Sequence, residues 1–182
     1  MIELFADEAD GGFFLTAADA EKLIVRTKDV RDGAVPSGNS VALLNLLRLS
    51  LVFDRADYRQ KAERTMEVLG GTMAESWYGF ERFLWAIDFN DSRPREIVIV
   101  GSPSQAETAA LIQVVHQRYD PYCVLVLLDP SASDKAAWQQ EVPLLRGKLL
   151  VEGKPTAYVC RNNVCRRPVM TASDLRRELE AN

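Results

Sequence analysis

The sequence has a single histidine, only three cysteines and no long apolar run. No apolar stretch approaches the roughly eighteen residues of a membrane-spanning helix, so a membrane protein is not expected. Three cysteines are too few, and odd in number, for the disulfide framework of a secreted domain, which makes reduced thiols the expectation. The N-terminal sequence MIELFADEADGG is acidic where a signal peptide would be basic. These features predict a cytoplasmic protein.

An excess of charge of one sign is also lacking. The chain has 26 acidic and 22 basic residues, scattered along its length, for a formal net charge of −4. This balance gives no electrostatic footprint for nucleic acid or for an anionic membrane surface, and neither is expected as a partner. With 182 residues, 47% of them apolar, the chain is long enough to bury a sizeable core as one domain or two small ones.

Apolar residues recur at helical spacing up to about residue 92, which predicts three successive helices. The three apolar sets are Val41, Leu44, Leu47 and Leu51; Tyr58, Ala62, Met66 and Leu69; and Met73, Trp77, Phe80, Leu84 and Ile87. The stretch 54–57 is expected to cap the second helix and Gly70-Gly71 to end it. Short connections favour antiparallel packing. Upstream, ELFAD and GGFFLT are expected to be extended around Gly11-Gly12.

Strands and helices alternate in the second region, residues 93–182. Apolar runs at 96–101 and 123–129 are typical of parallel strands covered on both faces, and a third strand is predicted at 156–160. Ser102 is expected to cap a helix whose inner face carries Ile112, Val115 and Tyr119. A last helix is expected from Thr171, with Leu175 and Leu179 facing inward. The fold class is therefore predicted as α/β, with antiparallel helices over 1–92 and a small three-stranded parallel β-α-β-α-β unit over 93–182.

The helix expected over about 40–52 has few polar positions, namely Asn45, Arg48 and Ser50. Nearly its whole circumference therefore requires burial. Two other helices do not suffice to surround it. Either the α/β unit covers it, or the chain is part of something larger.

Three stretches of the sequence carry a resemblance to a known family. They are GGFFLTAADAEKLIVRTKDVRDGAVPSGNSVALLNLLRL, YRQKAERT and PTAYVCRNNVCRRPV. Together they resemble the C-terminal part of the thioredoxin-domain-containing proteins related to bacterial YyaL and to a mammalian spermatogenesis-associated protein. The resemblance implies an N-terminal thioredoxin-like domain followed by a helical toroid similar to six-hairpin glycosidases. It implies that residues 1–92 are the end of an incomplete α-toroid, with the rest of the toroid and the thioredoxin-like domain as partners.

The polar corner before the buried helix supplies the candidate binding residues. Paired carboxylates, amides, hydroxyls and aromatic rings are the groups that bind sugars, which gives the candidates Asp29, Asp32, Ser37, Asn39 and Trp77. Asp7, Asp10, Tyr78 and Trp85 are further candidates. The competing interpretation is that Asp32 makes a turn, that Ser37 or Asn39 caps the helix, and that the tryptophans belong to the core. No catalytic residue is assigned.

Cys160 and Cys165 form a second candidate site across an Asn-Asn turn. Structural thiols or a small disulfide, redox exchange and a zinc site are the alternatives. The C-x4-C spacing lacks the helix N-terminus that activates a C-x-x-C thiol, and His116 lies far away in the sequence. No metal is therefore expected. IVIVGSPSQAET has a helix N-terminus suited to an anion, but it lacks both G-x-G-x-x-G and a P-loop lysine, so no nucleotide cofactor is expected.

Three functions follow as hypotheses. The first is a fragment that contributes one rim of a carbohydrate-binding cleft. The second is a non-catalytic scaffold or interaction module, whose apolar helices pair with another copy as a homo-oligomer. The third is a thiol-dependent redox module.

Overall fold

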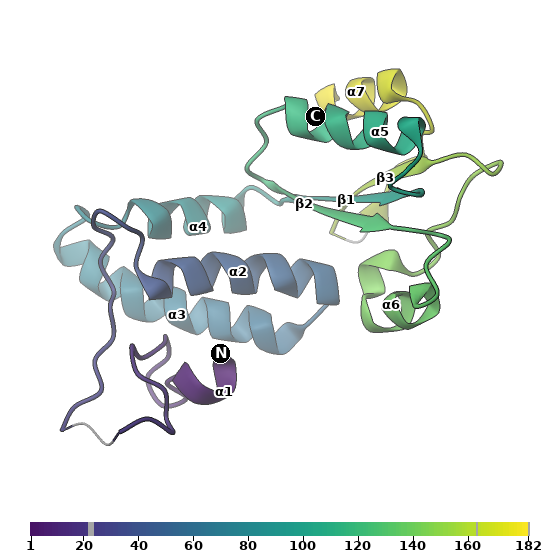
Figure 1. Ribbon diagram of the computed structural model, residues 1–182. Helices are drawn as coiled ribbons and strands as arrows, with labels where there is room; N and C mark the ends of the chain where they lie inside the picture. Colours follow the sequence, from purple (N-terminus) through teal and green to yellow (C-terminus); the bar gives the residue numbers. More distant parts are fainter. Residues whose placement is uncertain (22–23, 163, 182) are drawn as a thin grey trace. The chain divides into compact units, whose positions relative to one another are not determined.

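The computed structural model describes residues 1–21, 24–162 and 164–181 (Figure 1). The chain forms two compact units. One comprises Met1–Ser50 and Arg55–Asp91, and the other Leu51–Asp54 and Ser92–Asn182. The first unit is helical and the second contains a sheet with helices, so the predicted α/β class is confirmed. The prediction that the helical unit is the end of a toroid stays a prediction.

The helical unit is built on three long helices that follow a short one. The bounds are α1 Ile2–Phe5, α2 Gly38–Phe53, α3 Ala56–Glu75 and α4 Glu81–Asp91. The chain reverses direction between α2 and α3 and again between α3 and α4 (Figure 1). Fully buried side chains of this unit include Leu43, Leu44, Leu46, Leu47, Leu69, Phe80, Phe83 and Phe89. The four leucines at 43–47 all belong to α2. The expectation that nearly the whole helix is buried is met only in part, because eight of its sixteen residues are buried while Leu49 is 41% exposed.

Helix boundaries in this unit differ from the expected ones. Gly70 and Gly71 do not end the second helix, because α3 continues through them to Glu75. A glycine weakens a helix without forbidding it, and neither position requires a positive φ. The residue that caps α3 is Arg55, which makes no capping bond with its side chain.

The aromatic residues after α3 lie outside the helices. Trp77 was expected within the third helix, but it occupies the connection before α4 together with Tyr78, and the two residues are 73% and 72% exposed. The expected N-terminal strands are reduced to one antiparallel bridge between Ala6 and Phe13, because residues 2–5 form α1 instead.

The second unit contains a four-stranded mixed sheet in the order β2-β1-β3-β4. Its elements are β1 Arg95–Val100, α5 Ala106–Gln117, β2 Cys123–Leu128, α6 Lys135–Glu141, η1 Pro143–Leu145, β3 Thr156–Arg161, β4 Val164–Cys165 and α7 Ala172–Glu180. All six residues of β1 are buried, as expected of a central strand. Strand β2 lies at the edge of the sheet, and four of its six residues are only partly covered or exposed.

Helices α5 and α7 cover one face of the sheet. Ile97 and Ile99 of β1 pack with Leu111 and Val115 of α5 and with Leu175 of α7. Because side chains alternate along a strand, Val98 and Val100 point to the opposite face. That face is the one on which α6 lies (Figure 1).

The predicted parallel arrangement is correct for β1 and β2 and wrong for β3. Strand β3 pairs with β1 in the antiparallel direction, with Thr156 opposite Val100 and Cys160 opposite Glu96. Strand β2 runs in the same direction as β1, and its last residue, Leu128, lies opposite Val100. The segment 129–155 therefore starts and finishes at the same end of the strands. Its helix α6 has no buried residue, so it does not serve as the covered crossover that a parallel strand requires.

Two further details of this unit concern helix ends. Ser102 is not the N-cap of α5, which begins four residues later with Gln105 as its cap, and Tyr119 is 89% exposed instead of facing inward. The last helix is as predicted. The Thr171 side chain accepts a hydrogen bond from the Asp174 amide, and Leu175 and Leu179 are buried.

None of the helices in the described ranges is both long enough and apolar enough to cross a bilayer.

Two glycines give opposite predictions for the same change to alanine. A Cβ at Gly101 would lie 2.4 Å from Thr108 Oγ1 and 3.1 Å from Pro155 Cβ, so we expect Gly101→Ala to lower the free energy of unfolding by about 1–3 kcal/mol. A Cβ at Gly70, inside α3, meets nothing within 4 Å, and we expect Gly70→Ala to raise stability by about 0.5–1 kcal/mol. Urea denaturation of the two variants measures both effects. A stabilised Gly101→Ala variant would contradict this packing.

Candidate functional site

The polar corner at 32–39 is first of all the start of α2. Ser37 is buried, and its hydroxyl oxygen accepts a hydrogen bond from the Ser40 amide at 3.1 Å. The same hydroxyl donates to Ser40 Oγ at 2.9 Å. This is the geometry of a helix N-cap, which satisfies an amide that has no partner within the helix.

Asp32 joins this corner to α4. One carboxylate oxygen accepts from the Ser37 amide at 2.8 Å. The other accepts from the amides of Arg82 and Phe83 at 2.8 Å and 3.3 Å. Those two amides lie in the first turn of α4, where a negative charge also interacts favourably with the helix dipole. Asp32 thus binds the starts of two helices that are far apart in sequence.

Asn39 joins the corner to the N-terminal arm, by which we mean residues 6–13. Its side-chain oxygen accepts from the Phe13 amide at 2.7 Å, and its side-chain nitrogen donates to the carbonyls of Phe13 and Asp29 at 2.9 Å and 2.7 Å. The side chain is 2% exposed. A buried amide with this many partners holds two backbone segments in fixed positions.

The structure therefore brings four of the five predicted binding residues to one corner. Asp29 contributes its backbone carbonyl there, while Ser37, Asp32 and Asn39 contribute side chains that bind backbone groups. Trp77 lies in the connection before α4 and contacts Tyr78 edge to face. The ligand-binding role of these five residues stays a prediction, and the geometry gives three of them a structural role.

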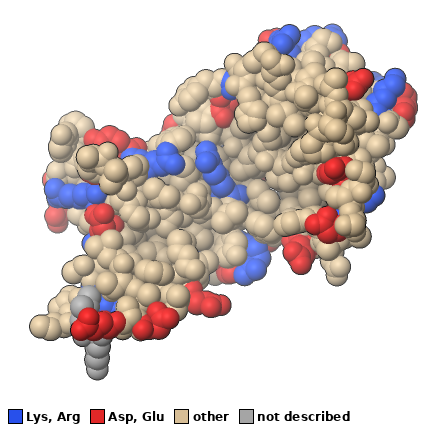
Figure 2. Space-filling view, in the orientation of Figure 1, with Lys and Arg blue, Asp and Glu red and all other residues tan. Residues whose placement is uncertain are grey.

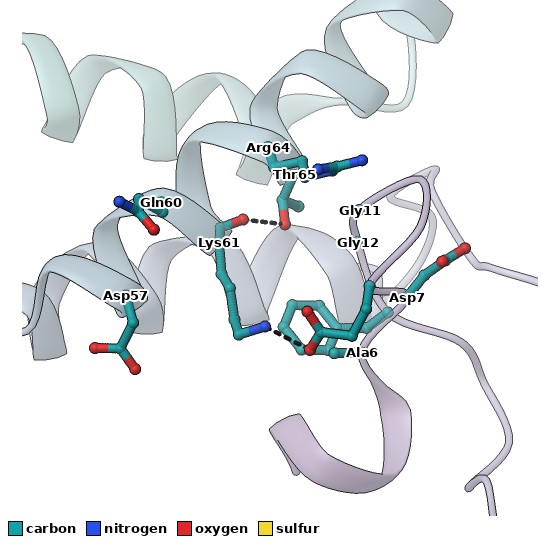
Figure 3. A pocket seen from close by; sticks show the side chains of 11 residues that line it. Ala6, Asp7, Gly11, Gly12, Asp57, Gln60, Lys61, Arg64 and Thr65 are labelled. Carbon is teal, nitrogen blue, oxygen red and sulfur yellow. Dashed lines mark hydrogen bonds and ion pairs between the residues drawn. The ribbon is translucent and has the colours of Figure 1, made fainter.

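A polar pocket lies beside this corner, between the N-terminal arm and α3 (Figure 3). Its volume is about 230 Å³. The arm contributes Asp7, Glu8, Gly11, Gly12 and Phe13, and α3 contributes Asp57, Gln60, Lys61, Arg64 and Thr65. Figure 3 shows Gln60 and Lys61 on successive positions of the helix, with Lys61 reaching toward the arm.

Ion pairs hold the wall of this pocket together. Lys61 Nζ lies 2.5 Å from Glu8 Oε1, and Lys28 Nζ lies 2.7 Å from Asp7 Oδ2. Arg64 donates from its guanidinium to the carbonyl of Ala9. The hydrogen bond from Lys28 is the largest cause that lowers the pKa of the Asp7 carboxyl below its ordinary value. Asp7 is therefore an ionised carboxylate at neutral pH.

Two glycines allow the arm to approach so closely. Gly11 and Gly12 have φ values of +87° and +74°, in the left-handed region that favours glycine. A Cβ at Gly11 would lie 2.7 Å from Arg64 Cγ, and a Cβ at Gly12 would lie 3.0 Å from Asn39 Oδ1. The pocket and the corner are therefore one structure, because the same loop contacts both.

The pocket presents acids, bases, an amide and a hydroxyl within a small volume. Asp7 was a secondary candidate in the sequence, whereas Gln60, Lys61 and Arg64 were noted only as part of the stretch YRQKAERT that carries the family resemblance, and not as candidate site residues. They lie on the exposed side of an amphipathic helix, where lysine, arginine and glutamine are ordinary. They come to lie opposite the carboxylates of the arm only because the arm folds back with positive φ values at its two glycines.

The cysteine pair forms a second site, in the other unit. Cys160 of β3 and Cys165 of β4 are directly opposite each other in the sheet and are joined by a disulfide, so the general expectation of reduced thiols does not hold for them. Cys160 is 1% exposed and Cys165 is partly exposed. Lys148 Nζ donates to Cys165 Sγ at 3.0 Å. Burial lowers the pKa of Lys148, and the Glu96 carboxylate opposes that change.

Within the described ranges, no three histidine, cysteine or acidic side chains are arranged so that they would hold a metal ion. The lone histidine, His116, is exposed near the end of α5.

Comparison with known proteins finds relatives much longer than this chain. Spermatogenesis-associated protein 20 from Rattus norvegicus and from Homo sapiens are each 33% identical over 178 residues, which is 97% of this chain and 22% of theirs. An uncharacterised protein of Caenorhabditis elegans is 25% identical over 165 residues, again 22% of its length. The chain thus spans about a fifth of the relatives it matches. No family model matches it. The resemblance to the spermatogenesis-associated family is confirmed.

Two variants test whether the side chains of the corner stabilise the fold. Asn39→Ala removes three hydrogen bonds and leaves buried backbone groups without partners, so we expect a loss of about 2–3 kcal/mol in the free energy of unfolding. Asp32→Ala removes the acceptor of three amides, with an expected loss of about 1–2 kcal/mol. Asp29→Ala is the control, because only the backbone of Asp29 takes part in the corner. Equal losses in all three variants, measured by urea denaturation, would contradict these assignments.

Proposed function

We propose, from the homology of this chain to spermatogenesis-associated protein 20, that it works as a segment of a longer thioredoxin-domain-containing protein and binds a hydroxyl-rich small molecule, such as a sugar, in the pocket between its N-terminal arm and α3. The observation that carries the proposal is the composition of that pocket. Carboxylates, cations, an amide and a hydroxyl line a volume of about 230 Å³.

A sugar presents many hydroxyl groups, each of which is both donor and acceptor. Glu8 and Lys61 are paired with each other, but each retains further hydrogen-bonding capacity toward a ligand, and Gln60 is exposed beside them. The pocket thus offers acceptors on the arm and donors on the helix at the same time. This arrangement suits a neutral polyol better than an ion of either sign, because both signs of charge are already balanced within the wall.

The chemistry of Asp7 does not suit the general acid of a glycosidase. Glycoside hydrolysis requires one carboxylic acid that is protonated when it meets the substrate. Asp7 has a lowered pKa and bonds to Lys28, so it does not hold a proton at neutral pH. A general acid would have to be a residue other than Asp7.

Two changes on α3 test the pocket. We expect glucose, mannose or an oligosaccharide of either to raise the melting temperature of the chain, and Gln60→Ala and Lys61→Gln to abolish that shift, because both residues line the pocket. Differential scanning fluorimetry over a range of sugars measures the effect.

The matched control is Glu67→Gln, an exposed residue on the same helix that lies outside the pocket. Its sugar response should equal that of the unaltered chain. Sugar binding that survives both pocket variants, or that disappears equally in Glu67→Gln, would sink the proposal.

A second candidate function is thiol–disulfide exchange at Cys160 and Cys165, and the contact of Lys148 with Cys165 favours it. An ammonium group beside Cys165 stabilises the thiolate of that residue once the thiol is released. No sequence pattern indicated this activation, because Lys148 precedes Cys165 by seventeen residues. In the cytoplasm, where the sequence predicts the protein, glutathione would supply the low-molecular-weight thiol for this exchange.

The exposure of the two sulfurs sets the order of the steps. The thiolate of a low-molecular-weight thiol attacks the more accessible Cys165 Sγ, the bond between Cys165 and Cys160 breaks, and Cys160 leaves as a thiolate that takes up a proton. A second thiol then attacks the outer sulfur of the mixed disulfide and releases Cys165 as a thiolate beside Lys148. Two external thiols are oxidised to one disulfide, and the protein disulfide is reduced to two thiols.

Removal of the ammonium group tests this candidate. In reduced protein carrying Cys123→Ser, we expect Lys148→Met to slow alkylation of Cys165 by iodoacetamide at pH 7 about fivefold, because the fraction of thiolate falls. Mass spectrometry assigns the alkylated residue. Lys154→Met, at an exposed lysine of the same unit, should leave the rate unchanged. The candidate fails if Lys148→Met and Lys154→Met react equally fast.

A further inference from the structure

Four arginines surround one surface hollow of the sheet unit, although the chain as a whole is acidic. The hollow has a volume of about 390 Å³, and we call it the arginine hollow. The charged side chains that line the hollow are those of Arg93, Arg95, Arg118, Arg161 and Asp120, and the aromatic ring of Tyr119 lines it as well. Elsewhere the two signs are mixed, as on the face of the molecule drawn in Figure 2. Four positive charges against one negative leave this hollow with an excess of positive charge.

The fold, and not the sequence, gathers these arginines. Arg95 begins β1, and Arg118 lies in the loop that leads from α5 to β2, at the same edge of the sheet. Because β3 is antiparallel to β1, its last residue, Arg161, comes to that edge as well, one position beyond the pair Glu96–Cys160. A parallel β3 would have carried Arg161 to the opposite edge.

One arginine of the hollow is fixed and three are free to bind. Arg95 is 7% exposed and pairs with Asp120 through its guanidinium, while its backbone amide donates to the Tyr122 carbonyl at 2.8 Å. This pair holds the loop against the strand. Arg93, Arg118 and Arg161 are exposed and make no side-chain hydrogen bond or ion pair with any described residue. Their guanidinium groups remain available to a ligand.

We propose that the arginine hollow is a binding site for the phosphate group of a small phosphorylated molecule, a phosphate monoester. Guanidinium groups bind phosphate oxygens through paired hydrogen bonds, and a dianion offsets the repulsion among the three free arginines. The volume is that of a small-molecule site. Tyr119 at the rim is 89% exposed and offers a ring face to the organic part of the ligand. A nucleic acid fits less well, because the net charge of −4 repels a polyanion.

Binding of three phosphate probes to the whole chain tests the site. Isothermal titration calorimetry at low ionic strength would use inorganic phosphate, glucose 6-phosphate and adenosine monophosphate. We expect at least one monoester to bind more tightly than inorganic phosphate, and Arg118→Gln and Arg161→Gln each to weaken its binding about tenfold. Tyr119→Ala should weaken adenosine monophosphate and not inorganic phosphate if the ring stacks on the base. If the chain binds glucose 6-phosphate and Tyr119→Ala leaves that affinity unchanged, the site is assigned to sugar phosphates.

The control is Arg167→Gln, an exposed arginine of the same unit outside the hollow. It removes one positive charge in the same way and should leave every affinity unchanged. Circular dichroism melting checks that all variants fold. The proposal is overturned if no phosphate compound binds, if Arg167→Gln weakens binding as much as Arg118→Gln does, or if a polyglutamate peptide binds while the monoesters do not. Because this site and the sugar pocket lie in different units, the two proposals fail independently.

Discussion

The side chain of Asn39 holds the helical unit in its arrangement, because it satisfies three backbone groups that belong to two other segments. Its bonds to Phe13 place the N-terminal arm on α2, and the arm in turn forms one wall of the polar pocket. Gly12 lies against Asn39 at a distance that leaves no room for a side chain. A buried amide that uses both of its donors and its oxygen is costly to replace, since either a shorter or an apolar side chain leaves backbone groups without partners.

Asp32 has a similar role a few residues earlier in the chain. Its carboxylate accepts hydrogen bonds from two amides at the start of α4 that have no acceptor within the helix. If the corner and the helix moved apart, these amides would lose their partner. The residue types that suggested a sugar-binding cleft are therefore used mainly to bind backbone. The groups that remain free to meet a ligand lie next to them, on the outer side of α3.

Sequence periodicity was sufficient for the existence of the long helices, although not for their ends, and for strand positions and the last helix cap, because these depend on neighbours within a few residues. Thr171 and Asp174, for example, satisfy each other locally. It failed where the answer depends on distant pairing. The run 156–160 is equally apolar whether β3 is parallel or antiparallel, and only the path of residues 129–155 along one edge decides between them. The candidate sites follow the same division: Asp32, Ser37 and Asn39 could be found from turn and cap chemistry, whereas Lys61, Lys148 and Arg161 could not.

The direction of β3 matters for chemistry as well as topology. Because β3 is antiparallel to β1, it ends beside the first residue of β1, which sets Arg161 near Arg95. The disulfide depends instead on the hairpin of β3 and β4, which sets Cys165 opposite Cys160. A substitution that altered the pairing of β3 with β1 would therefore act on the arginine hollow, and one that altered the hairpin would act on the disulfide. Independent loss of one site, as in Lys148→Met or Arg118→Gln, instead reports on its own side chains and leaves the pairing of the sheet intact.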